Sequence, residues 1–391
     1  MLGRRYFLNL LAAVPLAALP LAAADPVAEG WDHFYNLDYA AAVRSFRQAI
    51  AAQPADPSGY NYLAQAILYG ELYRLGVLES EMLTGNNYFL RTDKLRPNAQ
   101  TNAEFLETVR RAIDLSRARL KTNPQEVRAL YALGSSYGLF ANYEFMVQKN
   151  WKAAVSNGAE ARNYHRRVLS LDPRNYDAML IQGVYDYVIG SLPWHARLLA
   201  FLIGRTGDKN HGLQTIAQVA EKGALNKVDA QVMLAILYRR EKQPAAALRV
   251  LDPLLRAYPR NYLFQMEQAH MHSDLGHKGE ALAILRRLEQ EATSSRPDIP
   301  LEKVYYAIGD VQFWYRDLDD ALANMRRVTQ HRDLDLHTGT LAWMRQGQIL
   351  DLIGRRDEAR QAYRKAMEFA PQTAAAEESR RYLSSPYRRK G

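Results

Sequence analysis

Three histidines lie close together in the chain, and their spacing decides whether they could hold a metal ion. They are His270, His272 and His277. A metal-binding helix presents two histidines four residues apart so that both rings face one side. None of the 9 histidines forms such a pair, and residues two apart point to different sides. The sequence therefore predicts no metal site, and it contains no motif for another cofactor.

Catalytic motifs give a similar result. The sequence has no Gly-rich phosphate loop, no G-x-S-x-G turn and no HExxH helix. Neighbouring acids such as Asp319 and Asp320 are typical of turns and helix starts. With 0 cysteines, disulfides, thiolate metal sites and a lipidated N-terminal Cys are excluded. A carboxylate pair assembled from distant positions stays open as an alternative, but we expect a non-enzymatic protein.

Composition and charge indicate a folded protein with an ordinary surface. The 391 residues are 48% hydrophobic and 24% charged, which is enough to bury a core. The net charge of +9 would suit nucleic acid or an anionic membrane if it were concentrated. Positive and negative residues are instead mixed along every expected helix. We therefore expect a solvated surface and no nucleic-acid partner.

Residues 340–371 indicate two amphipathic helices joined by a turn. Inner-face positions recur at i, i+4 and i+7, namely Trp343, Gly347 and Leu350 in the first helix and Ala359, Tyr363 and Ala366 in the second. Gly354 accepts the left-handed conformation that ends a helix, and Pro371 stops the second one. The small residues at 347 and 359 predict a close antiparallel pair.

This pattern resembles the tetratricopeptide repeat (TPR), whose signature spans about 34 residues. Gln346 and Leu350 stand where the signature has Leu and Tyr. Small residues at the matching second-helix position occur at Ala42, Ala112, Ala161, Gly212, Ala247, Ala281, Ala321 and Ala359. The resemblance implies an all-α, right-handed solenoid of about eight helical hairpins. Residues 374–383 are expected to form a C-terminal capping helix.

The repeats divide into an irregular N-terminal half and a regular C-terminal half. We expect the first half to span residues 25–224, with insertions at 76–101, 139–157 and 189–211, and the second half to span 225–384. His165 occupies a second-helix core position, so it is expected to be a packed core histidine. Residues 385–391 form a short basic tail that we expect to be disordered.

Residues 1–24 have the features of an export signal. Arg4 and Arg5 precede an apolar stretch, and residues 22–24 offer a small-residue cleavage site before Asp25. The start resembles a twin-arginine signal, with the general secretory route and an uncleaved membrane anchor as alternatives. Cleavage near Ala24–Asp25 in a bacterium would place the protein in the periplasm.

The third insertion contains the most apolar stretch after the signal, residues 192–204. Residues 191–213 resemble a segment of the inclusion-body-clearance and tetratricopeptide-repeat-thirty-nine family, which implies a non-catalytic adaptor with a conditional association with lipid or membrane-bound cargo. Trp194, Arg197 and Phe201 are the candidate membrane or interface residues. The alternative is a buried helix within the solenoid, because 13 residues are too few to cross a bilayer.

The first helices of TPR hairpins line a concave face, and this family expectation predicts the binding site. The matching stripe contains several large apolar side chains, which suit a peptide or helix of a protein partner. The predicted groove residues are Arg239, Met266, His270, Tyr306, Asp310, Phe313, Met344, Gln348 and Asp351. An inserted segment or the superhelix itself could cover them instead. We expect an exported scaffold that binds a protein or peptide partner, with membrane association as the alternative.

Overall fold

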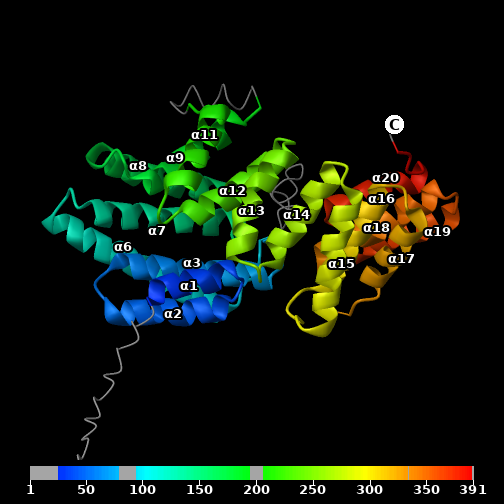
Figure 1. The fold of residues 1–391 in the computed structure, drawn as a ribbon, viewed down its shortest axis with the longest axis horizontal. Helices are drawn as coiled ribbons and strands as arrows, with labels where there is room; N and C mark the ends of the chain where they lie inside the picture. Colours follow the sequence, from blue (N-terminus) through cyan, green and yellow to red (C-terminus); the bar gives the residue numbers. More distant parts are fainter. Residues whose placement is uncertain (1–24, 79–93, 194–205, 333, 390–391) are drawn as a thin grey trace, which may run out of the picture.

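The computed structural model describes residues 25–78, 94–193, 206–332 and 334–389. This part of the chain is all-helical, with seventeen helices and no strand (Figure 1). The helices are α1 Pro26–Tyr35, α2 Tyr39–Ala52, α3 Pro57–Arg74, α6 Ala99–Thr122, α7 Val127–Met146, α8 Trp151–Leu171, α9 Tyr176–Gly190, α11 Lys209–Lys222, α12 Lys227–Arg240, α13 Pro244–Ala257, α14 Tyr262–Asp274, α15 Lys278–Ser294, α16 Leu301–Trp314, α17 Leu318–Thr329, α18 Leu336–Leu352, α19 Arg356–Phe369 and α20 Ala374–Ser384.

Successive helices pack as hairpins that stack into a solenoid. The pairs are α1 with α2, α3 with α6, α7 with α8, α9 with α11, α12 with α13, α14 with α15, α16 with α17, and α18 with α19. The small residues predicted at the second-helix positions are all buried in the second helix of a pair. The predicted helical-hairpin solenoid is therefore confirmed.

Polar residues define where the helices begin. A side-chain oxygen accepts a hydrogen bond from a first-turn N–H at Asp25, Asp38, Asp56, Asn98, Asn150, Asn175, Asp208, Asn261, Asp335 and Thr373. Such caps satisfy N–H groups that have no partner within the helix. As predicted, Gly354 follows α18 with a positive φ of 80°.

The insertions are described in part. The first and third contain residues 79–93 and 194–205, so Trp194, Arg197 and Phe201 lie outside the described residues. The second insertion belongs to long helices, because α7 has 20 residues and α8 has 21. Across the described ranges, no helix is long and apolar enough to span a membrane.

Repeats that are far apart in the chain also contact one another. The first helices (blue in Figure 1) lie against the middle of the chain at α12–α14. The ring of Tyr35 lies 5.1 Å from that of Tyr258, and the Tyr73 ring lies 6.3 Å from that of Tyr262. This contact closes the N-terminal part of the superhelix around its concave face.

The C-terminal segment also folds back on the solenoid. Residues 385–389 follow α20 and run over α16 and α18, where Tyr387 packs against the cluster that contains Phe313. The expectation of a disordered tail is therefore wrong for these five residues, because aromatic contacts and hydrogen bonds hold them.

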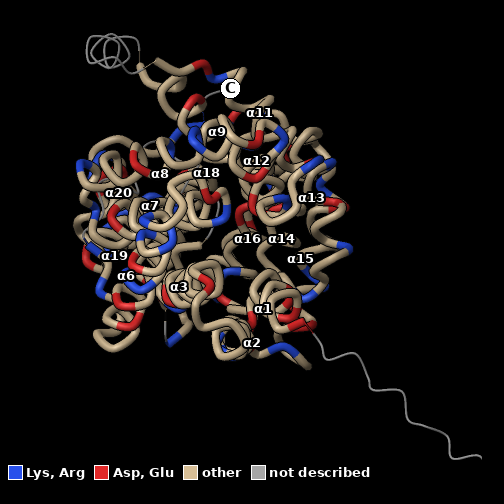
Figure 2. The backbone as a smooth tube through the Cα atoms, turned by 90° about the vertical axis from the view of Figure 1, so that its left-hand side faces the viewer, with Lys and Arg blue, Asp and Glu red and all other residues tan. Residues whose placement is uncertain are grey.

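Charges are distributed as the sequence predicted. Figure 2 shows Lys and Arg interspersed with Asp and Glu over the labelled helices, with no face of one sign in this view. Many of these residues form ion pairs with one another, such as Arg355 with Glu358 and Arg47 with Glu104.

A glycine-to-alanine pair tests the close packing of hairpin helices. A Cβ at Gly347 would lie 2.4 Å from Cε1 of Tyr363, whose fully buried ring is fixed by a hydroxyl bond to Asp351. We expect Gly347→Ala to destabilise the protein by roughly 1–3 kcal/mol because the site is overpacked. Urea unfolding measures the change.

Gly158 provides the matched control. It lies within α8, and a Cβ there meets nothing within 4 Å. Gly158→Ala should therefore stabilise the helix by about 0.5–1 kcal/mol. Equal effects of the two substitutions would contradict the packing described here.

Candidate functional site

The concave face encloses a cavity of about 640 Å³. Its wall comes from the first helices of successive pairs, together with parts of α8 and α13, and is mostly apolar. Val188 of α9 and Leu225 before α12 are 51% and 47% exposed and line it. Such apolar exposure at a concave surface is typical of a binding site.

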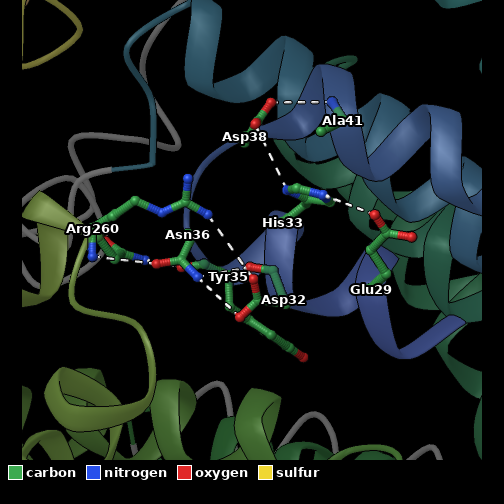
Figure 3. A network of polar contacts seen from close by, with 9 residues as sticks. Glu29, Asp32, His33, Tyr35, Asn36, Asp38, Ala41 and Arg260 are labelled. Carbon is green, nitrogen blue, oxygen red and sulfur yellow. Dashed lines mark hydrogen bonds and ion pairs between the residues drawn. The ribbon is translucent and has the colours of Figure 1, made fainter. Parts of the chain in front are cut away.

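The first hairpin forms one wall of the cavity, and a polar junction fixes it to the α13–α14 connection. The Nδ2 of Asn261 donates to the carbonyl oxygen of Tyr35 at 2.7 Å, and this bond is buried. Figure 3 shows the neighbouring contacts, in which Arg260 reaches the end of α1. Its backbone N–H donates to Oδ1 of Asn36 at 3.2 Å, and its guanidinium lies 3.9 Å from Asp32.

A carboxylate inside the cavity completes the junction. Asp229 of α12 accepts hydrogen bonds from the hydroxyl of Tyr35 at 2.9 Å and from Nε2 of Gln65 at 3.4 Å. Within the described ranges, no Lys, Arg or His forms an ion pair with it. Burial raises the pKa of Asp229, and the bonds from Tyr35 and Gln65 oppose that shift. The carboxyl group of Asp229 therefore joins three helices, α1, α3 and α12, through hydrogen bonds and not through an ion pair with a described residue.

Charged side chains on α12, α14 and α16 stand at or beside the cavity. Arg239 donates to Glu267 at 2.8 Å, and both side chains are largely buried. His270 lies 3.8 Å from the same carboxylate. Lys303 lies 3.9 Å from Asp335. These partners hold the charged groups in fixed positions, so the cavity combines apolar walls with placed polar groups.

The structure divides the predicted groove residues into two sets. Met266, His270 and Tyr306 line the cavity, and Arg239 stands beside it through its pair with Glu267. This arrangement agrees with the predicted concave stripe at the middle of the solenoid.

The remaining groove residues lie elsewhere. Asp310 binds Arg345 at 2.6 Å. Phe313, Met344 and Gln348 are 0%, 6% and 3% exposed and the Asp351 side chain is 0% exposed, which agrees with the alternative that the chain itself covers this part of the stripe. The C-terminal segment and the neighbouring helices cover them, so part of the stripe is occupied by the chain itself.

The histidines take several positions. His270 belongs to the Glu267 cluster, while Nδ1 atoms of His272 and His277 lie 3.4 Å apart across the turn between α14 and α15. In the described part of the chain, no three metal-binding side chains come together. His165 is buried and stacks on Tyr131 at 5.0 Å, and burial lowers its pKa to about 4. The prediction of a core histidine is therefore confirmed at 165.

Sequence reasoning missed the closing role of Tyr35 and Asn261. A signal was present, because α1 and the start of α2 carry four aromatic residues close together, namely Trp31, Phe34, Tyr35 and Tyr39. Trp31, Phe34 and Tyr39 pack within the first repeats, whereas Tyr35 also reaches Tyr258. Periodicity marks these positions as apolar but does not identify their distant partner.

Comparisons with known proteins agree with this architecture. A tetratricopeptide repeat profile matches residues 27–71 and 232–297, and a second tetratricopeptide repeat profile matches residues 341–373. No curated protein shows significant sequence similarity to the chain. The matched segments and the stacked hairpins support a tetratricopeptide repeat protein.

Solved structures with a similar helical arrangement are distant in sequence. A thermophilic TPR protein from Thermus thermophilus is 15% identical, with 63% of this chain and 96% of that chain covered and a TM-score of 0.35. Yeast Tom70 is 12% identical, covering 92% and 88%, with a TM-score of 0.41. The human IFIT1 dimer with m7Gppp-AAAA is 13% identical, covering 92% and 84%, with a TM-score of 0.46. None of these likenesses bears on function.

The pKa of Asp229 generates a pH-dependent prediction. Because the folded-state pKa is raised, stability from this group is fully present below the ordinary carboxyl pKa of about 3.9 and is lost as pH rises through the folded value. Asp229→Asn cannot ionise and still offers an oxygen to Tyr35. We expect it to raise the melting temperature at pH 7 and to change it little at about pH 4.

Asp319→Asn is the control for this measurement, since Asp319 is an exposed first-turn acid of α17. It should not reproduce the pH-dependent gain. A loss of stability in Asp229→Asn at pH 7 would show that the ionised carboxylate is required at the junction.

Proposed function

We propose that this protein is an exported, non-catalytic scaffold that binds a segment of a protein partner in the cavity of its concave face. The TPR fold is typical of proteins that bind other proteins, which supports the general class. The single observation that carries the finer proposal is the cavity of about 640 Å³ that the first helices enclose.

The size and lining of the cavity favour a short segment over a large flat surface. Binding cavities commonly measure about 300–1,000 Å³ and combine apolar walls with a few placed polar groups. Val188 and Leu225 supply accessible apolar area here. Glu267 and His270, held by their mutual contact, supply polar groups that can orient a bound chain.

Export is the second part of the proposal. It rests on the N-terminal sequence, in which Arg4 and Arg5 precede an apolar stretch and a small-residue cleavage site. Asp25 caps α1, so cleavage before this residue leaves every described helix complete. A mature chain that begins at Asp25 would therefore fold with the same first hairpin and the same cavity.

Substitutions in the cavity wall test the binding site. We expect Val188→Glu with Leu225→Glu to abolish capture of the partner after cross-linking, because two charges would enter an apolar wall. The matched control is Val155→Glu with Leu171→Glu, two residues of α8 that are 41% and 40% exposed and do not line the cavity.

Photo-cross-linking locates the contact directly. A benzophenone side chain at position 188 should join a partner that the same group at position 155 does not reach. Equal capture by the two double variants, with circular dichroism showing that both fold, would place the binding site outside the cavity.

Processing of the N-terminus tests the export proposal. The protein expressed from its full gene in a Gram-negative host should appear in the periplasmic fraction with Asp25 as its first residue. Arg4→Lys with Arg5→Lys should block this processing if the twin-arginine route is used. Recovery of unprocessed protein in the cytoplasm for both forms would contradict export.

Membrane association through residues 192–204 is the alternative function. Its support is the apolar sequence of that stretch, with Trp194, Arg197 and Phe201, which lies almost entirely outside the described residues. Co-sedimentation of the protein with anionic vesicles at low salt would favour this alternative.

A further inference from the structure

The C-terminal segment occupies a part of the concave face in the manner of a bound peptide. Residues 385–389 leave α20 without forming a further helix and cross the ends of α18 and α16. The side chains of Tyr387 and Arg389 contact α16, whereas Arg388 between them is exposed to solvent. This alternation is that of an extended chain, so the segment is recognised through every second side chain.

The site for Tyr387 is built from three helices. Its ring lies 6.1 Å from that of Phe313 in α16 and makes an edge contact with Tyr382 of α20 at 5.3 Å. Its backbone N–H donates to Oδ2 of Asp351 in α18 at 2.7 Å. The aromatic rings therefore select an apolar side chain while the carboxylate binds the main chain of the same residue.

Asp351 is held ready for this contact. Its side chain has no solvent exposure and accepts hydrogen bonds from Arg356 at 2.9 Å and from the hydroxyl of Tyr363 at 2.9 Å. Arg356 also donates to the carbonyl oxygens of Tyr382 and Leu383. Arg356 and Tyr363, which precede the tail, thus position the Asp351 carboxylate. The backbone N–H of Tyr387 is its further donor.

The site for Arg389 is the exposed indole of Trp314. The guanidinium lies 5.0 Å from the ring centroid and donates to the carbonyl oxygen of Trp314 at 2.8 Å. The indole is oriented by a hydrogen bond from its Nε1 to Asp310 at 3.1 Å and remains 47% exposed. A cation over an indole face is favourable, and arginine adds the directed hydrogen bond.

We propose that this surface of α16, α18 and α20 is a peptide-recognition site for a partner segment in which an aromatic residue is followed two positions later by arginine. The chain's own residues 387 and 389 occupy it, and a partner segment with the same pattern binds by displacing them. The proposal goes beyond the cavity-binding function, because it concerns a second surface that is separate from the cavity.

Displacement is feasible because the tail is short and lightly held. Residues 385 and 386 are exposed. The segment is held by the ring of Tyr387, the guanidinium of Arg389 and three hydrogen bonds, one of them from the N–H of Ser385 to the carbonyl oxygen of Arg381. Its covalent connection gives it a high local concentration, which a competing segment must overcome. The partner therefore binds the intact protein more weakly than a protein whose tail cannot occupy the site.

The experiment uses a fluorescent peptide with the sequence of residues 384–391 as the probe. The receptor is the full-length protein with Tyr387→Ala and Arg389→Ala, which leaves the tail attached but unable to fill the site. Anisotropy should show binding to this receptor at least about tenfold tighter than to the wild type. Thermal unfolding confirms that the receptor is folded.

Peptide variants supply the matched control. Peptides with Tyr387→Ala or Arg389→Ala should lose about tenfold or more in affinity, since each removes one anchor. A peptide with Arg388→Ala has the same charge change as Arg389→Ala and should bind like the native peptide.

Three results would overturn the proposal. They are no binding of the native peptide to the folded receptor, equal binding to receptor and wild type, and an equal loss for the Arg388→Ala and Arg389→Ala peptides. If the receptor variant does not fold, the full-length protein with Arg389→Ala alone serves as the receptor, and equal binding of the native peptide to it and to the wild type would overturn the proposal. The cavity variants at 188 and 225 should bind the peptide normally, so this test and the cavity test fail independently.

Discussion

The contact between the first hairpin and the α13–α14 connection is the constraint on which the cavity depends. A repeat solenoid is normally held by contacts between neighbouring units, which leaves its concave face open along its length. In this protein, buried Asn261 binds the carbonyl oxygen of Tyr35, a residue 226 positions earlier in the chain. The first hairpin is thereby fixed as an additional wall across from the middle repeats.

The position of the first hairpin also determines the hydrogen bonding of the carboxyl group of Asp229 in the cavity. Asp229 has its hydroxyl donor on α1 and its amide donor on α3, so a movement of the first hairpin away from α12 would remove the Tyr35 donor from a buried carboxyl group. An unpaired polar group in a low-dielectric site is costly. The polar junction therefore favours one hairpin position, whereas the apolar and aromatic contacts around Tyr258 would tolerate several.

The sequence predicted the parts of the fold that local patterns determine. Ala42, Ala247 and Ala359 identify where the two helices of a hairpin pack, because each lies in a helix that packs against the helix directly before it in the chain. The closing contact of Tyr35 with Asp229 spans 194 positions, and no period in the chain encodes it. For a similar reason, the sequence left open whether the chain itself covers Phe313 and Asp351. Both lie on the predicted stripe, but the segment around Tyr387 that covers them follows no repeat pattern.

The most direct test of the closed superhelix is a distance between the first hairpin and α13. The chain contains 0 cysteines, so spin labels can be placed at Glu29→Cys and Arg256→Cys without background. Both side chains are exposed and take no part in the junction. Pulsed electron paramagnetic resonance should give one narrow distribution at the distance set by the closed structure. A broad distribution at longer distances would show that the first hairpin is free of the middle repeats, and would contradict the enclosed cavity.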